Sequence, residues 1–240
     1  MHSTLTVTIL LLIALAAIAV YYGIPLVHSR WSRIVLRRRA VARSAVALTL
    51  DDGPGSNLTP AILDILAAHR IKATFFILGR NIAGREDMLR RIAAEGHQIG
   101  SHGYSHINYW KVCPWRAISD IKEGWHAINR VLGASATYPF RPPHGKLTIL
   151  CLLYLWFRRA PVVYWTIDSS DTWMPPARRD EHKAAATLRQ HRGGVILAHD
   201  FDKQQDNAQP FVLTAVEELL ATADEEHMAM LTVSDLLRSE

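Results

Sequence analysis

Two adjacent carboxylates, Asp51 and Asp52, follow an apolar run that ends at Leu50, and a Gly-Pro turn follows them. Successive side chains of an extended strand point in different directions, so one carboxylate can bind a metal ion while its neighbour acts on a water beside it. A turn that merely closes a strand is the alternative, because Asp, Gly and Pro dominate turns. Histidines further along the chain favour the chemical interpretation.

The histidines His102 and His106 are separated by three residues. On a helical turn such positions share one face, so both imidazoles could reach one ion. The spacing alone is often a coincidence, but with Asp52 it supplies three protein ligands and leaves a position for water or substrate. This ligand set suits Zn²⁺, with Co²⁺, Ni²⁺ or Mn²⁺ as alternatives.

An arginine and a further histidine follow later strand-like runs. Arg141 precedes a rigid Pro-Pro-His-Gly turn. It is either simply solvated or pairs with Asp51, keeping that carboxylate ionised and oriented. His199 ends a purely apolar run. It has the pKa range needed to protonate a leaving amine, and a nearby carboxylate would keep it charged.

The elements that must position these residues alternate between strand-like and helix-like runs. Seven strands with intervening helices predict an α/β domain of βα repeats, closed as a barrel or open as a wound sheet. The candidate residues, with Asp168, would lie at C-terminal strand ends, the catalytic face of a βα barrel. The expected strands are 46–50, 73–78, 97–100, 138–141, 162–166, 195–199 and 228–232, and the expected helices are 58–69, 85–95, 114–132, 147–157, 181–191 and 209–223.

The charge distribution argues against a nucleic-acid partner. The net charge is +5 and the pI about 9.4, but six arginines lie before Ser44 without one acidic residue, and the rest of the chain is nearly neutral. We interpret this local basic patch as the flank of a membrane segment. The six residues are Arg30, Arg33, Arg37, Arg38, Arg39 and Arg43.

The uncharged run Leu5–Val27 is long enough, at ~1.5 Å per residue, to span a hydrocarbon core of ~30 Å. A cleaved signal peptide is the alternative, but no Lys or Arg precedes the run, and it exceeds a typical signal core. We therefore predict a single-pass protein held in the lipid bilayer by residues 5–27. The predicted parts are a membrane anchor at 1–27, an arginine-rich linker at 28–44 and a folded domain at 45–240.

Five motifs make the chain similar to a known family, the NodB-homology polysaccharide deacetylases of carbohydrate esterase family 4. Their order along the chain makes the resemblance more specific than any one motif. The resemblance implies a distorted (β/α)7 barrel, a divalent metal ion and hydrolysis of an amide. The motifs are T-L-D-D-G-P at 49–54, H-G-Y-S-H at 102–106, R-P-P-H-G at 141–145, D-S-S-D-T-W at 168–173 and L-A-H at 197–199.

The resemblance also implies roles for individual residues. It makes Asp52, His102 and His106 the metal ligands and Asp51 the general base. His199 would be the general acid that delivers a proton to the departing nitrogen.

Supporting roles follow from the same resemblance. Arg141 would orient Asp51, Asp168 would hold and charge His199, and a backbone N–H near His144 would help to stabilise the oxyanion. Contacts with the substrate are expected at Pro143, His144, Trp173 and Leu197.

The chain departs from the family pattern at three places. Leu50 and His144 stand where a Phe and a Tyr are usual, and Thr172 separates Asp171 from Trp173. All the expected catalytic groups remain, so substrate choice is what these departures affect.

The leading prediction is a metal-dependent hydrolase that removes an N-acyl group, acetyl above all, from an amino sugar in a polysaccharide or in a polyprenyl-linked precursor. One alternative is a membrane-tethered glycan-binding protein without catalysis, which the intact Asp51 and His199 argue against. Another is a related metal-dependent hydrolase acting on a non-sugar amide, because fold and metal do not fix the substrate.

The side of the membrane is left open by two opposed arguments. The positive-inside rule places the domain in the cytoplasm, whereas family habit favours export to cell-wall glycan. The run 147–157 is apolar around nearly its whole circumference, whereas an outer barrel helix has one wet face. It is either covered by protein or rests in the membrane interface with Arg158 and Arg159 at headgroup level, close to a lipid-linked precursor.

Overall fold

The computed structural model describes residues 2–171, 180–202 and 208–238. Its centre is a parallel β-sheet in which the strands follow the order β3-β2-β1-β5-β4, with β6 paired to β1. The chain is therefore an α/β protein, as the alternating pattern predicts. The strands are β1 (Ala45–Asp51), β2 (Thr74–Ile77), β3 (Gln98–Ser101), β4 (Ile167–Asp168), β5 (Gly194–His199) and β6 (Ala229–Met230).

The helices follow the predicted runs closely. The sequence pattern did not predict the short last helix or two 3₁₀ turns, η1 (Gly79–Ile82) and η2 (Pro143–Gly145). The helices are α1 (His2–Ala42), α2 (Leu58–Ala68), α3 (Glu86–Ala94), α4 (Pro114–Leu132), α5 (Ile149–Phe157), α6 (His182–His191), α7 (Ala208–Glu225) and α8 (Val233–Leu237).

Two expected strands are reduced to single bridges. Phe140 pairs with Ser101 on one side and with Val162 on the other, both in parallel. Pro139, Pro142 and Pro161 flank these positions, and proline cannot donate a ladder hydrogen bond, so regular pairing stops there. The closed seven-stranded barrel is not confirmed, because the described strands form a six-stranded sheet with these bridges at its side.

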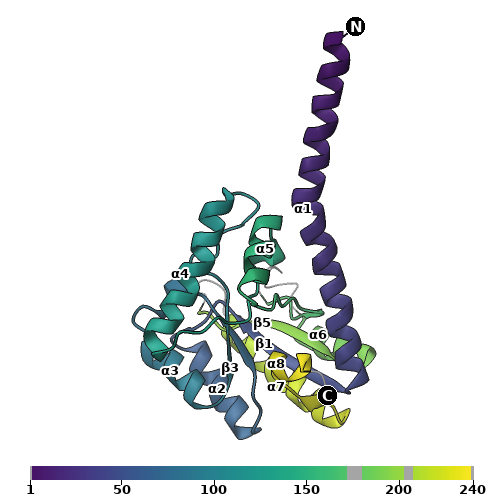
Figure 1. Ribbon diagram of the computed structural model, residues 1–240. Coiled ribbons are helices and arrows are strands. Elements are labelled where there is room, and N and C mark those ends of the chain that lie inside the picture. Colours follow the sequence, from purple (N-terminus) through teal and green to yellow (C-terminus); the bar gives the residue numbers. More distant parts are fainter. Residues whose placement is uncertain (1, 172–179, 203–207, 239–240) are drawn as a thin grey trace.

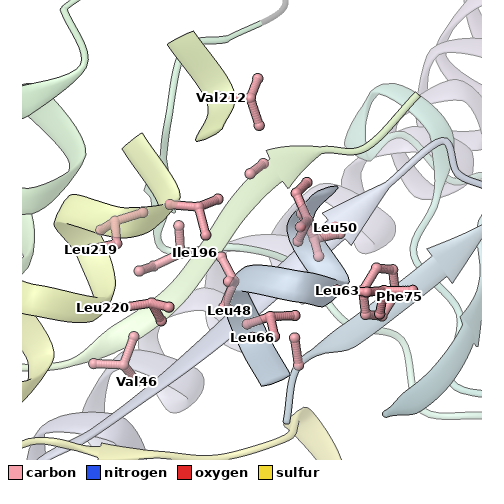
Figure 2. Close-up of a cluster of buried hydrophobic side chains, with 14 of the residues drawn as sticks. Val46, Leu48, Leu50, Leu63, Leu66, Phe75, Ile196, Val212, Leu219 and Leu220 are labelled. Carbon is pink, nitrogen blue, oxygen red and sulfur yellow. The ribbon is translucent and has the colours of Figure 1, made fainter. Parts of the chain in front are cut away.

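One face of the sheet is buried beneath α2 and α7. All seven residues of β1 are buried, as expected for a central parallel strand. Alternate residues of that strand point into the cluster drawn in Figure 2, where side chains from β5 and from the two helices meet them. This packing fixes β1 and β5 side by side. The cluster includes Val46, Leu48, Leu50, Leu63, Leu66, Ile196, Leu219 and Leu220.

The opposite face of the sheet is covered in part by α1. This helix runs unbroken from His2 to Ala42, and its N-terminal half projects away from the domain (Figure 1). Its C-terminal half packs inward, with Leu36 and Ala40 buried in a cluster with Ala47 and Val195. The segment expected to be a linker, residues 28–44, is therefore helical as far as Ala42 and rests on the sheet.

By length and composition, α1 is apolar enough to cross a membrane, a property that an N-terminal signal sequence shares. Not all of its arginines act as a membrane flank, however. Arg33 donates to the carbonyl of Trp165 at 3.1 Å, Arg43 donates to the carbonyl of Asp235 at 2.7 Å, and Arg39 donates to a carbonyl of α8. Part of the basic patch therefore attaches the helix to the domain, which weakens the charge argument for a cytoplasmic domain.

Candidate active site

The C-terminal ends of the central strands gather the predicted residues. In the register of the sheet, Asp51 at the end of β1 lies opposite His199 at the end of β5. Carboxyl ends of parallel strands meet at one edge, where α/β proteins place their ligands. The two residues with expected proton-transfer roles are therefore neighbours.

Arg141 lies directly behind Asp51. The buried guanidinium donates from Nη1 to Asp51 Oδ1 at 2.7 Å and to Thr49 Oγ1 at 2.6 Å, while its Nε donates to the carbonyl of Val163 at 3.3 Å. The other oxygen, Asp51 Oδ2, lies 3.9 Å from His102 Nε2. One oxygen of the carboxylate is thus fixed by Arg141, and the other faces the histidines.

Burial sets the proton affinity of Asp51. It raises the pKa of this carboxyl above its ordinary value, although the charges of Arg141 and His199 oppose that rise. A carboxylate with a raised pKa accepts a proton more readily than an exposed one. The position therefore suits a general base.

Asp52, His102 and His106 form a compact group of possible metal ligands, with ligand atoms within 4.8 Å of one another. Asp52 Oδ1 lies 3.6 Å from His102 Nε2 and 3.5 Å from His106 Nε2. Ligands that bind one zinc ion tetrahedrally at ~2.0–2.1 Å lie about 3.3 Å apart. The two distances from Asp52 Oδ1 are close to that value.

The orientation of His102 leaves its Nε2 available to a metal. Its Nδ1 lies 2.8 Å from the carbonyl oxygen of Arg141, which can only accept, so Nδ1 carries the proton. Burial lowers the pKa of His102 to about 3, and the ring is therefore neutral at pH 7. A neutral ring with a free Nε2 lone pair is the form that binds metals.

The chemistry of Asp52 supports the same interpretation. Its Oδ1 is buried, and no hydrogen-bond donor meets it among the residues that the structure describes. A buried carboxylate oxygen without a donor is costly unless a cation satisfies it. The residues present therefore fit a divalent ion.

The two histidines do not share a helical turn, contrary to the geometry predicted from their spacing. They lie in a loop in which Gly103 and His106 have φ angles of +80° and +56°. The carboxylate of Asp120 on α4 holds this loop by accepting from the backbone N–H groups of Tyr104 at 3.1 Å and Ser105 at 2.9 Å. The buried carboxylate, rather than helix geometry, directs His106 toward Asp52.

The partner of His199 is Asp171 rather than Asp168, which corrects the sequence prediction. Asp171 Oδ1 lies 2.8 Å from His199 Nδ1, and its Oδ2 accepts from the backbone N–H of His199 at 2.8 Å. Asp168 Oδ1 instead accepts from the backbone N–H of Ser170 at 2.8 Å. That bond forms an Asx turn. The turn changes the direction of the chain, so that Asp171 rather than Asp168 reaches His199.

The pair of Asp171 and His199 is arranged to keep the imidazole charged. Burial alone lowers the pKa of His199, but the charge and hydrogen bond of Asp171, with the charges of Asp52 and Asp51, raise it to about 9. Burial alone would raise the pKa of Asp171, yet His199 lowers it below its ordinary value. His199 can therefore hold a proton at neutral pH.

The expected substrate contacts lie around the rim as far as the structure describes them. Pro143 is buried, and the exposed His144 places its ring edge-on to His106 at 4.6 Å between centroids. Leu197 lies on β5, 5% exposed and paired with Thr49. Trp173 lies outside the described residues.

Sequence reasoning missed a buried carboxyl behind the site. Asp200, next to His199, accepts from Thr59 Oγ1 at 2.7 Å, and its burial raises its pKa to about 7. It packs against Gly53 so closely that a Cβ at that position would overlap its carboxyl group. The sequence held one signal for this arrangement, a glycine directly after Asp52.

Fold and site together define a class of protein, a hydrolytic enzyme with a buried carboxylate and a charged histidine side by side on one edge of an α/β sheet. The family model for polysaccharide deacetylase matches residues 38–153. The chain belongs to the polysaccharide deacetylases, the family with NodB homology, whose members hydrolyse amide C–N bonds. The resemblance carried by the five motifs is thereby confirmed.

Two relatives and one solved structure illustrate the similarity. The chain is 34% identical over 166 residues to a chitooligosaccharide deacetylase of Rhizobium leguminosarum bv. phaseoli, covering 68% of this chain and 71% of the relative. It is 40% identical over 129 residues to a peptidoglycan-N-acetylglucosamine deacetylase of Bacillus cereus, covering 54% of this chain but only 46% of that enzyme. The crystal structure of the Bc1960 peptidoglycan N-acetylglucosamine deacetylase aligns with a TM-score of 0.71 and 28% identity, covering 82% of this chain and 89% of that one.

Proposed function

We propose that this protein is a metal-dependent deacetylase that removes the acetyl group from N-acetylglucosamine units of a glycan. The observation that carries the proposal is the pairing of Asp51 with His199 at the ends of β1 and β5, beside the group formed by Asp52, His102 and His106. The two relatives named above act on peptidoglycan and on chitooligosaccharides, so N-acetylglucosamine is the unit that their substrates share.

The side chains divide the work of amide hydrolysis. A divalent ion bound by Asp52, His102 and His106 would polarise the acetyl carbonyl and make a water more acidic. Asp51 takes a proton from the attacking water through Oδ2, while Arg141 holds Oδ1 in place.

His199 acts in the second step of the reaction, the breakdown of the tetrahedral intermediate. It delivers its proton to the sugar nitrogen as the C–N bond breaks. The products are acetate and a free amine on the sugar. Asp171 keeps the imidazole oriented and charged for this step.

We also propose that residues 45–240 form the catalytic domain and that residues 1–27 anchor it in the bilayer. The distorted (β/α)7 barrel stays part of this proposal. It is supported by the parallel bridges of Phe140, which carry the pairing from β3 toward the segment that leads into β4.

A lipid-linked amino sugar is the finer substrate that we propose. An anchored domain reaches a sugar carried on a polyprenyl lipid more readily than a distant polymer. Peptidoglycan and chitin-like oligosaccharides are the competing substrates, and an exported domain would favour them.

The alternative of a silent glycan-binding protein is disfavoured because Asp51, His199 and their partners Arg141 and Asp171 form a complete proton-transfer arrangement. Hydrolysis of a non-sugar amide is the other alternative, because the site itself does not select a sugar.

The test is a substrate screen on the full chain in detergent. Peptidoglycan fragments, chitooligosaccharides, polyprenyl-linked N-acetylglucosamine and non-sugar acetamides are incubated with the protein, and the free amine is quantified. We expect amine release with at least one of the three sugar substrates and none with Asp51→Asn, which keeps the size of the side chain but removes its negative charge and its basicity. Release from non-sugar acetamides alone would refute the sugar substrate.

A further inference from the structure

The helix α5 exposes an unusual apolar face. Among the described residues outside α1, the exposed large hydrophobic side chains are Trp115 on α4 and three residues of α5, namely Leu153, Trp156 and Phe157. Trp156 is 70% exposed and Phe157 is 75% exposed. Cys151 and Leu155, on the inner side of the helix, are fully buried. The helix thus meets the protein core on one side and presents aromatic rings on the other.

This exposed face continues onto α1. A groove of about 520 Å³ lies between the two helices and is lined by Leu152, Leu153, Trp156 and His28 among others. A second groove of about 550 Å³ shares His28 and runs along α1 past Val27 toward its N-terminus. One apolar surface therefore extends from the candidate membrane span to α5; we call these residues of α1 and α5 the α1–α5 surface. The second groove is lined by Ala19, Val20, Gly23, Ile24, Val27, His28 and Trp31.

The position of α5 along α1 matches the edge of a bilayer. The run from Leu5 to Ile24 accounts for a hydrocarbon core of ~30 Å at ~1.5 Å per residue. The domain first meets α1 near that end, where the ring of Tyr22 lies 5.3 Å from the ring of Trp110. In Figure 1, α5 lies beside α1 below its projecting half.

The chemistry of the α1–α5 surface suits the membrane interface. Aromatic rings concentrate at the boundary between hydrocarbon and headgroups, and arginine binds anionic headgroups. Trp156 and Phe157 supply such rings, and Arg158 and Arg159 follow them directly. A soluble partner would need charged or hydrogen-bonding groups at the rim, whereas the grooves are lined mainly by apolar side chains that continue into the span.

We propose that the α1–α5 surface lies in the bilayer interface and docks the catalytic domain on the membrane. This inference rests on the proposed membrane anchoring of α1. The occupant of the grooves is lipid acyl chain, and the headgroups lie at Arg158 and Arg159.

Docking brings the catalytic rim close to the lipid. Trp110, which meets Tyr22 of α1, donates from Nε1 to the carbonyl of Leu147 at 2.8 Å, between the rim turn and α5. The ammonium of Lys146 lies 5.0 Å from the same ring. One tryptophan thus joins the end of the span, the loop after His106 and the loop after His144.

The first experiment measures depth in the membrane. In the full chain with Cys113→Ser, which removes the exposed native thiol, a fluorophore is placed at Phe157→Cys. The protein is reconstituted in vesicles of phosphatidylcholine and phosphatidylglycerol with plain or brominated acyl chains. Control labels are placed at Leu12→Cys, within the span, and at Asp87→Cys on α3, whose side chain is 98% exposed.

We expect bromine to quench the label at position 157 several-fold more than the label at 87. If the label at 12 is quenched and the label at 157 is quenched no more than the label at 87, α1 spans the bilayer and the docking of α5 is refuted. If the label at 12 is also unquenched, the anchoring on which the inference rests fails, and the inference fails with it.

The second experiment separates docking from catalysis. Trp156→Ser/Phe157→Ser should lose turnover of polyprenyl-linked N-acetylglucosamine in vesicles by about tenfold, because two interfacial aromatic rings are removed. Its turnover of soluble chitooligosaccharide should stay within about twofold of the unaltered chain, since neither ring contacts the site. Equal losses on both substrates would contradict a docking role. Absence of turnover by the unaltered chain on all three sugar substrates of the screen would reject the proposed function but leave the quenching result standing.

Discussion

Asp171 holds His199 with both of its carboxylate oxygens, one on ring Nδ1 and one on the backbone N–H, each at 2.8 Å. Such a two-point attachment fixes the ring rotation as well as its tautomer. In the proposed mechanism, Nε2 is therefore the ring atom that delivers the proton.

This attachment predicts that substitution of Asp171 lowers the reaction rate far more than substitution of Asp168. Asp171→Asn should lower kcat by about 100-fold, because the general acid loses its charge partner and its orientation. Asp168→Asn, which keeps an acceptor for the N–H of Ser170, serves as the matched control and should lose much less. Steady-state kinetics of both variants compare them, and a larger loss at Asp168 would restore the assignment made from the sequence.

The pH profile of the reaction follows from the raised pKa of His199. The folded pKa of about 9 lies above the ordinary value of 6.5, so the acid stays protonated through neutral pH and loses its proton as the pH rises through about 9. The alkaline limb of kcat against pH should fall near pH 9. In Asp171→Asn the limb should move to lower pH, because the largest charge that raises the pKa is gone. An unmoved limb would assign the acid to another group.

The buried pair of Arg141 and Asp51 should also matter for stability. Arg141→Met leaves Asp51 buried without its cation, and such a loss costs about 3–5 kcal/mol of unfolding free energy. The double variant Arg141→Met/Asp51→Asn should recover part of that loss. Urea denaturation monitored by tryptophan fluorescence measures the unfolding free energies of the double variant and of each single variant. If the losses of Arg141→Met and Asp51→Asn simply add in the double variant, the interaction between the two side chains does not stabilise the fold.

Asp120 gives a prediction about metal affinity. This carboxylate holds the backbone of Tyr104 and Ser105, and so the loop that ends at His106. Asp120→Ala should weaken metal binding by about 10–100-fold, as loss of a group supporting a ligand does. Glu123→Ala on the same helix is the control. Competition with a fluorescent chelator measures the affinities, and equal values for the two variants would exclude this role.

Several elements could be predicted from the sequence because local signals coincide with the tertiary structure. Pro114 begins α4 at a position that tolerates proline, and Gly133 ends it in a left-handed conformation, so the expected helix 114–132 agrees with the structure. Asp51, His102 and Arg141 could be grouped because each follows a strand-like run, and parallel strands bring such ends together.

Other features of the structure depend on tertiary geometry that cannot be predicted from the local sequence. Asp168 and Asp171 have equal chemistry, and only the turn at Ser170 decides which of them meets His199. Leu36 and Ala40 pack α1 on the sheet, but the three residues between them are exposed arginines. The sequence of this segment is therefore typical of a charged linker and does not reveal its buried face.

The most direct measurement of the central claim joins metal content to deacetylation in one preparation. The protein is freed of metal with a chelator, reloaded with Zn²⁺ in steps, and acetate release from a chitooligosaccharide or lipid-linked substrate is measured at each step. We predict that activity disappears on chelation and returns in proportion to one bound ion. His106→Ala should regain neither metal nor activity, and Asp51→Asn should regain metal without activity. Undiminished acetate release from metal-free protein would contradict the account.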